Sequence, residues 1–197
     1  TGDKGATGDK GAKGETGDKG ATGDKGATGD KGPTGDPGSS MQCFCVKQMR
    51  NILQQIITKY PTDTLVVSMK SGETATGRAG SLLSGANAGL FQLINAQSEP
   101  QEAVSICNIV AVSITSASYK AMDFLSAPST LNDCGADCNS AIRAYIPIDT
   151  NAKIKADGKT VADGKVVANA DGMIVTVNEN DLNPIFVSTC SIEILKK

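Results

Sequence analysis

Residues 2–38 read GDKGATGDKGAKGETGDKGATGDKGATGDKGPTGDPG, with a glycine at every third position from Gly2 to Gly38. Of the 22 glycines in the 197-residue chain, 13 lie in this segment. A strict three-residue glycine period is the signature of the collagen triple helix, because only glycine fits where three polyproline-like chains meet at the axis. A flexible linker is the alternative, but a linker has no reason to keep a period. We therefore predict a collagen-like stalk over residues 1–38, which requires three chains.

The other positions of the repeat are charged rather than rich in proline. Only Pro33 and Pro37 occur in it, so preset backbone geometry contributes little to the predicted triple helix. Asp-Lys dipeptides recur instead, and in three staggered chains they can form ion pairs that are individually weak when exposed. We expect this triple helix to be only marginally stable alone and to be stabilised either by trimerisation of the following domain or by more repeat upstream.

Five threonines occupy the third position of their triplets and point outward from the predicted helix. They are either solvated polar residues or acceptors for O-glycosylation, which would stiffen and solubilise the stalk. The sequence alone leaves both interpretations open. The candidates are Thr7, Thr16, Thr22, Thr28 and Thr34.

Composition argues against several classes of function. A formal charge of -2 and a pI near 5.2 argue against nucleic-acid binding, which favours a basic domain. No run approaches the roughly 20 apolar residues that a membrane-spanning helix needs. The chain has no histidine, so the commonest general base is missing and no conventional nucleophile–base pair can be assembled. We predict a protein that is not an enzyme and that needs no cofactor.

Residues 39–197 have the patterns of a folded domain. Ser39 and Ser40 can cap a helix, and apolar residues then recur at three- and four-residue spacing from Val46 to Tyr60, where Pro61 ends the run. Short β-branched segments separated by glycine turns follow, and they predict five strands. The predicted strands cover 64–70, 74–82, 90–95, 103–107 and 109–114.

The same order recurs in the second half of this region. A helix is predicted over 134–146 and is followed by Pro147, as the first helix is followed by Pro61. Two landmark pairs keep a spacing of 18 positions in both halves, Gly89 with Cys107 and Gly172 with Cys190. We predict a tandem repeat, with the first copy at 39–118, a linker at 119–133 and the second copy at 134–197.

Two segments carry a resemblance to a known fold. Residues 65–77, LVVSMKSGETATG, and residues 105–112, SICNIVAV, resemble the Sm-like branch of the SH3-like small barrels, in which a helix precedes five short, bent strands. Sm-like barrels are known for closing into rings by pairing edge strands between subunits, which removes exposed sheet edges. The RNA-binding signature of most members is absent here, so ring formation is what the resemblance implies. The predicted fold is a collagen stalk followed by a mainly-β (α+β) head of two tandem small barrels.

The predicted stalk and the predicted tandem repeat of the head lead to the same stoichiometry. A collagen helix brings three chains together, and two barrels in each chain make six, a number that Sm-like rings adopt. We therefore predict a homotrimer whose heads close into a pseudo-hexameric ring with the two repeats alternating. Such a ring would also hold the chains of the stalk in register.

All six cysteines lie in the head, and the predicted repeat divides them into two matched pairs and two cysteines without a counterpart. Cys45 is matched with Cys134 at the start of each helix, and Cys107 with Cys190 near each closing strand. The two cysteines without a counterpart are Cys43 and Cys138.

Several roles are open to these cysteines. Cys107 and Cys190 are either small buried hydrophobic residues or halves of disulfides in an oxidising compartment. In the disulfide interpretation the pairs within each repeat are Cys45–Cys107 and Cys134–Cys190, which leaves Cys43 and Cys138 for bonds between chains, although sequence cannot fix the connectivity. A zinc site of Cys43, Cys45, Cys134 and Cys138 is the alternative, but Cys-x-Cys is an unusual spacing for zinc ligands.

Three Asp-Gly dipeptides in the second repeat suggest calcium at first sight. None of them lies in a twelve-residue loop that ends in glutamate, which a calcium-binding helix–loop–helix requires. Asp-Gly is a favoured dipeptide of hairpin turns, so we interpret them as turns between strands and predict no metal site. They are Asp157-Gly158, Asp163-Gly164 and Asp171-Gly172.

The chain as a whole is similar to the collagen-like surface proteins of bacteria. Residues 1–38 carry this resemblance, and the cysteine-rich head makes the chain most similar to exosporium and spore-appendage glycoproteins of spore-forming Firmicutes. The resemblance implies an extracellular structural subunit of a fibre or nap, which we expect to self-associate and to be locked by disulfides, with other surface or spore-coat proteins as further partners. The alternative is a trimeric adhesin or phage tail-fibre module that presents a binding head on a collagen stalk.

Overall fold

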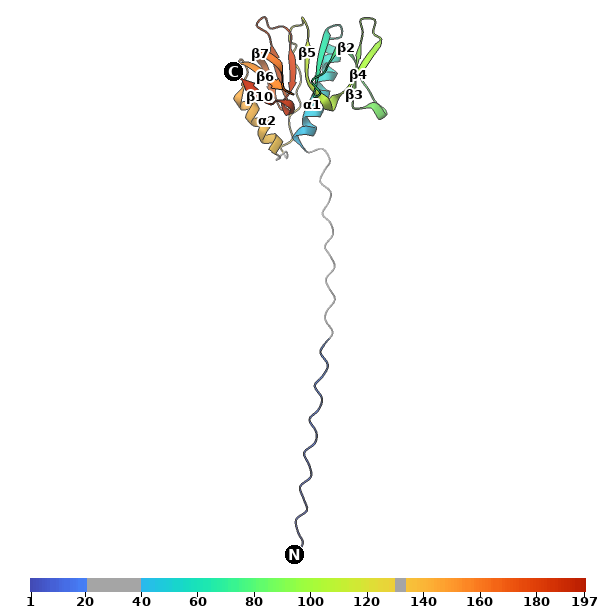
Figure 1. Ribbon diagram of the computed structural model, residues 1–197, viewed down its shortest axis with the longest axis vertical. Coiled ribbons are helices and arrows are strands. Elements are labelled where there is room, and N and C mark those ends of the chain that lie inside the picture. The colour runs from blue at the N-terminus through green and yellow to red at the C-terminus, as the bar shows by residue number, and fades with distance from the viewer. Residues whose placement is uncertain (21–39, 130–133) are drawn as a thin grey trace. The chain divides into compact units, whose positions relative to one another are not determined.

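The structure is a computed structural model that describes residues 1–20, 40–129 and 134–197. The chain divides into two units, Thr1–Gly35 and Asp36–Lys197. Within the first unit, residues 1–20 form neither helix nor strand and are exposed along their whole length (Figure 1). The predicted triple helix needs three chains and stays a prediction, and its residues 21–38 lie outside the described ranges.

The second unit, the head, is built on one open antiparallel sheet (Figure 1). Its ten strands follow the order β10-β6-β7-β8-β9-β5-β1-β2-β3-β4 from edge to edge. The helices are α1 (Met41–Lys59) and α2 (Cys134–Tyr145). The strands are β1 (Thr64–Met69), β2 (Thr74–Leu82), β3 (Leu90–Ile94), β4 (Pro100–Ser105), β5 (Ile109–Ile114), β6 (Asn151–Ala156), β7 (Lys159–Ala170), β8 (Met173–Val177), β9 (Ile185–Ser188) and β10 (Ile194–Lys196).

One helix followed by five strands occurs twice in this order. The first five strands lie as β5-β1-β2-β3-β4 and the second five as β10-β6-β7-β8-β9, which is the same arrangement. The residue registers agree as well, because Phe91 faces Val104 between β3 and β4, and Ile174 faces Val187 between β8 and β9. Both residues of the second pair follow those of the first by 83 positions (174 − 91 and 187 − 104). Single turns of 3-10 helix, η2 (Ile106–Asn108) and η3 (Thr189–Ser191), stand at matching places.

The prediction of two closed barrels differs from this arrangement. Among the described residues, no strand pairing closes either set of five on itself. Instead, β9 of the second set pairs with β5 of the first, so both sets belong to one continuous sheet. The physical reason is that the backbone groups at these two edges are satisfied by each other rather than within each set.

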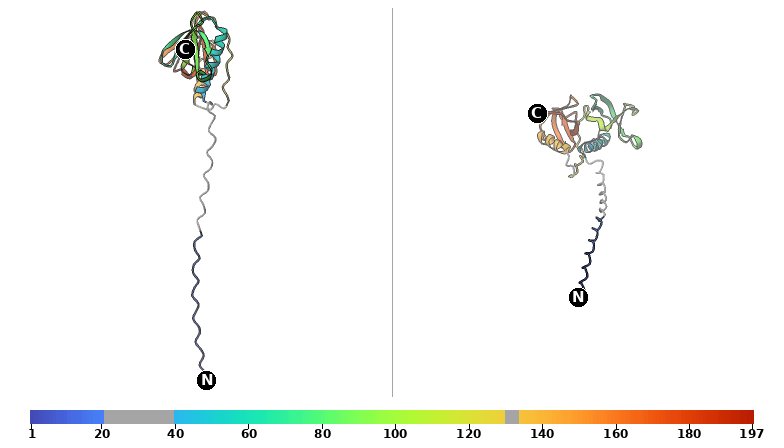
Figure 2. Two further views of the ribbon diagram at one scale, coloured as in Figure 1. Left: turned by 90° about the vertical axis from the view of Figure 1, so that its right-hand side faces the viewer. Right: turned by 60° about the horizontal axis from the view of Figure 1, so that its bottom comes forward.

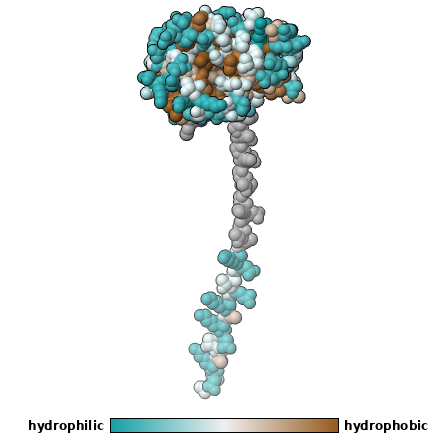
Figure 3. All heavy atoms as spheres, turned by 45° about the horizontal axis from the view of Figure 1, so that its top comes forward, coloured by the Kyte–Doolittle hydropathy of each residue, from teal (hydrophilic) through white to brown (hydrophobic). Residues whose placement is uncertain are grey.

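The helices cover the sheet and complete its core. Ser40 caps α1 as predicted, since its Oγ accepts a hydrogen bond from the Cys43 amide at 3.3 Å. The buried face of α1 packs on strands of both sets, and α1 and α2 lie side by side (Figure 2). The visible surface of the head is mostly hydrophilic, with apolar side chains gathered toward its middle (Figure 3).

Two of the three predicted Asp-Gly turns are confirmed and one is wrong. Gly158 and Gly172 adopt φ values of +70° and +77° between successive strands. The Asp163-Gly164 dipeptide instead lies inside β7. A Cβ atom at Gly164 would come within 2.1 Å of the carbonyl oxygen of Val177, so this glycine allows close approach of β8 rather than a turn.

Candidate functional site: the junction between the two repeats

The two repeats meet through a pair of antiparallel strands. In β5 and β9, Ala111 faces Val187, Val112 faces Phe186 and Ser113 faces Ile185. The amide of Ile114 donates to the carbonyl of Pro184 at 3.0 Å, which continues the ladder past β9. Val112 and Phe186 are fully buried. This β5–β9 contact, called the internal junction below, therefore behaves as part of the core and not as a surface contact.

Residues 115–120, which follow β5, form further hydrogen bonds that hold the same junction together. Asn183 accepts the Ser116 amide on its Oδ1 at 2.6 Å and donates its own amide to the carbonyl of Ala117 at 2.9 Å. The Tyr60 hydroxyl donates to the carbonyl of Ser118 at 3.1 Å and accepts the Lys120 amide at 2.7 Å. Burial raises the pKa of the Tyr60 phenol above its usual range, and the hydrogen bond from Lys120 offsets part of that rise.

Helix α1 of the first repeat reaches across the junction onto the second repeat. A Cβ atom at Gly172 would lie 3.2 Å from the Phe44 ring and 3.3 Å from the Gln48 side chain, so glycine is required where the helix crosses the β7–β8 turn. Gln48 is fully buried, and its Nε2 donates to the carbonyls of Leu125 and Asp171 at 3.1 and 2.7 Å. Its Oε1 accepts the Leu125 amide at 3.0 Å. One side chain thus ties α1, the 119–129 segment and the second repeat together.

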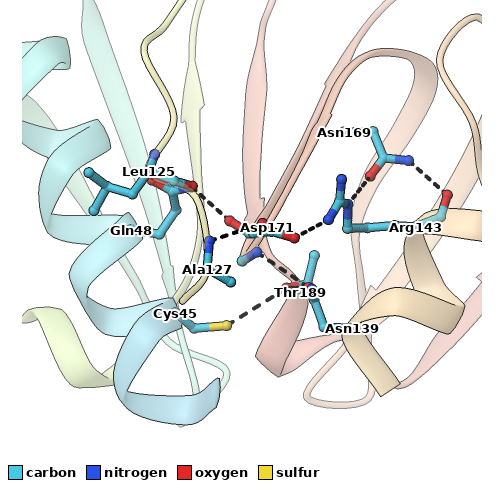
Figure 4. A network of polar contacts seen from close by, with 10 residues as sticks. Cys45, Gln48, Leu125, Ala127, Asn139, Arg143, Asn169, Asp171 and Thr189 are labelled. Carbon is cyan, nitrogen blue, oxygen red and sulfur yellow. Dashed lines mark hydrogen bonds and ion pairs between the residues drawn. The ribbon is translucent and has the colours of Figure 1, made fainter. Parts of the chain in front are cut away.

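Asp171 continues this polar network toward α2 (Figure 4). Its carboxylate accepts the Ala127 amide at 3.0 Å and forms an ion pair with Arg143 of α2. Asn169 accepts from Arg143 Nε and donates to the carbonyls of Arg143 and Ile146. The network fixes the end of α2 on the same turn that α1 covers from the other side.

A disulfide joins the two repeats at the junction. Cys45 of α1 is bonded to Cys190 of η3, with their Cα atoms 6.2 Å apart and a sequence separation of 145. Thr189, next to Cys190, is buried, donates to Asn139 Oδ1 at 2.7 Å and has its Oγ1 3.7 Å from Cys45 Sγ. The bond therefore spans the repeats, and it sits beside the buried contact of η3 with α2.

This connectivity corrects the predicted pairs Cys45–Cys107 and Cys134–Cys190. Both pairs were placed within one repeat, whereas α1 packs on both repeats and its N-terminal part brings Cys45 to Cys190. Cys45 is also unavailable for the zinc site considered above. Among the described residues, no cluster of three or more potential ligands could hold a metal ion. The remaining cysteines are Cys43, half-buried on α1; Cys107 and Cys138, exposed and free; and Cys134, the first residue of α2.

The threonine candidates lie in the stalk unit. Thr7 and Thr16 are exposed, whereas Thr22, Thr28 and Thr34 lie outside the described residues. The buried polar residues of the junction were not among the predicted site residues. The sequence did indicate that Gln48 is buried, because this polar residue lies between Cys45 and Ile52 on the apolar face of the helix.

The open edges of the sheet carry the counterparts of the internal junction. Of the strands that the structure describes, β4 pairs only with β3 and β10 only with β6, so the outer edges of β4 and β10 are free. By the offset of 83 residues, β10 is the counterpart of β5, and β4 is the counterpart of β9. Each head therefore has a free counterpart of β5 at one end of its sheet and a free counterpart of β9 at the other end.

Comparison of the chain with protein-family models, with curated proteins and with solved structures finds no match. No helix among the described residues is long and apolar enough to cross a membrane.

Proposed function

We propose that the chain is a structural, self-assembling subunit of an extracellular bacterial fibre or surface nap, trimerised by a collagen stalk and closed into a ring through its heads. The observation that carries the proposal is the internal junction, whose two halves recur unpaired at opposite edges of the sheet. Two complementary free edges favour pairing with further copies of the same chain. The glycine period of residues 2–38 supports three chains in each assembly.

The internal junction supplies a register for pairing between copies. Adding 83 to each residue number of β5 gives its counterpart in β10, and subtracting 83 from each residue number of β9 gives its counterpart in β4. The three residue pairs of the internal junction then set each residue of β10 against a residue of β4 in the next copy. Ile194 then faces Val104, Leu195 faces Ala103 and Lys196 faces Glu102. The Ile194 side chain is 48% exposed in the single chain, so it gains burial in this arrangement.

Charge supports the same register. Lys196 lies opposite Lys153 in the β6–β10 pair, and Lys153 lies opposite Asp163, to which it is ion-paired at 2.7 Å. Like charges directly opposite each other are unfavourable in a sheet. Glu102 of the next copy would extend this row and place a negative charge beside Lys196. In the described part of the chain, neither Lys196 nor Glu102 forms an ion pair of its own.

Extracellular localisation rests on separate grounds. The disulfide Cys45–Cys190 is consistent with an oxidising compartment, since stable disulfides are rare in the cytosol. The resemblance of residues 1–38 to collagen-like surface proteins points the same way. In this proposal the assignment to spores and the contacts with other coat proteins rest on the cysteine-rich head, and glycosylation of the stalk rests on the resemblance of residues 1–38.

The test is native mass spectrometry of the full chain with electron microscopy of the same sample, before and after reductant. We expect masses in multiples of three chains and one closed ring of heads on each stalk. The edge-blocking variant is Ala103→Pro. Ile106 donates its amide to Gly89, and by alternation along the strand the Ala103 amide points to the open edge, so proline removes no hydrogen bond within the chain.

The matched control is Ala103→Thr, which keeps the amide and a good strand former. We expect Ala103→Pro to separate the heads and Ala103→Thr to keep the ring. A monomer would contradict both the stalk and the ring. Discrete trimers with three separate wild-type heads would contradict self-assembly and favour the adhesin or tail-fibre type of binding module.

A further inference from the structure

A free thiol lies beside the disulfide that joins the two repeats. Asn139 of α2 and Thr189 of η3 are hydrogen-bonded at 2.7 Å, and Thr189 lies against Cys45 (Figure 4). The residues next to this hydrogen-bonded pair in the chain are Cys138 and Cys190. Cys138 is free and exposed, whereas Cys190 forms the disulfide with Cys45. Three cysteines therefore gather where α1, α2 and η3 meet.

Cys138 and Cys190 line one hollow between α1, α2 and η3. The volume of this hollow is about 440 Å³. Its α2 wall is formed by residues three and four positions apart, which lie on one face of a helix. They are Gly135, Cys138, Asn139 and Ile142. Cys138 is therefore on the face of α2 that lies toward η3, and Gly135, which has no side chain, leaves room one turn before it.

The two sulfur atoms of the disulfide differ in accessibility. Cys45 is only 2% exposed, whereas Cys190 is half-buried and borders the hollow. Disulfides are exchanged by attack of a thiolate on one of their sulfur atoms, so access decides which sulfur is attacked. A thiolate in the hollow meets the sulfur of Cys190 and not that of Cys45.

The free thiol of Cys107 is less well placed for such an attack. Cys107 borders a second cavity together with Cys45, but the volume of this cavity is about 10 Å³, at the lower limit for a single water molecule. A side chain has no room to move there, and the sulfur that it would meet is the buried one. The geometry therefore favours Cys138 over Cys107.

We propose that Cys138 exchanges with the Cys45–Cys190 disulfide and takes Cys190 as its partner. The Cys138 thiolate attacks the sulfur of Cys190, and a new bond forms between these two atoms. The bond to Cys45 breaks, and its electron pair stays on the Cys45 sulfur, which takes up a proton in place of the one that Cys138 gave up. One disulfide is kept, so the step needs neither an oxidant nor a reductant.

The exchange changes what the disulfide holds together. Cys138 and Cys190 both belong to the second repeat, so the new bond lies within that repeat. The internal junction is then held by hydrogen bonds and packing, without a covalent bond between the repeats. The exchange takes place within one chain and does not depend on the proposed ring.

The test traps the exchanged bond in the full chain. Cys45→Ala leaves Cys190 without its partner, and in a glutathione redox buffer we expect a Cys138–Cys190 bond, identified by mass spectrometry of an unreduced digest with fragmentation to separate Cys138 from Cys134. Cys45→Ala with Cys138→Ser should lose this bond and regain labelling of Cys190 by a maleimide. Cys45→Ala with Cys107→Ser is the matched control and should keep the bond, because Cys107 is also free and exposed but lies on η2.

Wild type gives a second measurement without a change in the core. Incubated at mildly alkaline pH without oxidant or reductant, and then blocked with a maleimide in denaturant, it should gain label at Cys45 and lose the same amount at Cys138. A labelling pattern that does not change with time would overturn the exchange, whatever bond Cys45→Ala forms. Linkage of Cys190 to Cys107 or Cys134 would overturn the assignment to Cys138. Neither result bears on the proposed ring.

Discussion

Removing the internal disulfide tests the view that α1 is fastened across the junction. The change is Cys45→Ala with Cys190→Ala, in a Cys107→Ser background so that no bond between chains interferes. The bond closes a loop of 145 residues, and the loss of loop-closure entropy for that length is worth about 5 kcal/mol at 25 °C as an upper value. Measured losses for native disulfides are commonly about 2–5 kcal/mol. We therefore expect the free energy of unfolding to fall by about 3–5 kcal/mol.

The assay is urea denaturation followed by circular dichroism at one fixed protein concentration. With an m-value of about 2 kcal/mol/M, this loss lowers the midpoint by about 2 M. Cys43→Ala on the same helix is the control and should leave the midpoint unchanged, because Cys43 is free and half-buried. A loss below about 1 kcal/mol in the double variant, or a parent midpoint that reductant does not lower, would refute the reasoning.

Three further predictions concern the head and the stalk. Gln48→Ala removes four hydrogen bonds of a buried side chain and should lower the free energy of unfolding by about 3 kcal/mol in urea denaturation, and Gln48→Met, which fills the space without the hydrogen bonds, should not restore it. The raised pKa of Tyr60 means that the unfolded chain loses this proton first, so stability should fall as pH rises above about 10, and Tyr60→Phe should flatten that fall in part, since burial also raises the pKa of Tyr119. Gly17→Ala should lower the melting temperature of the stalk measured by circular dichroism, whereas Ala12→Ser, outside the glycine positions, should not; equal effects would argue against a triple helix.

The elements of the head were largely predictable because local patterns specify them. The predicted strands 74–82 and 109–114 match β2 and β5, and the glycine turn predicted between the first two strands lies at Gly72, whose φ is +78°. β4 begins at Pro100 rather than 103, since its first residues are polar and exposed and give no hydrophobic signal. Repetition of the order was visible because spacing between landmarks survives even where residue types differ.

The junction could not be predicted from the same patterns. Cys45 and Cys190 meet only because α1 crosses onto the other repeat, a placement that depends on packing between elements far apart in sequence. A buried glutamine on an apolar helix face was the one local sign that a polar network lay there.

The position of the two open edges at opposite ends of the sheet has a consequence for symmetry. A contact of β10 with β4 is heterologous, with a different patch on each partner, so it can be repeated from copy to copy without limit. Such contacts give closed rings when the rotation per copy divides the full circle, and helical filaments when it does not. A stalk that gathers three chains would select the closed form by limiting the number of copies within reach. Chains separated from their stalks would keep the same edges without that limit, and they would be the ones free to grow end to end.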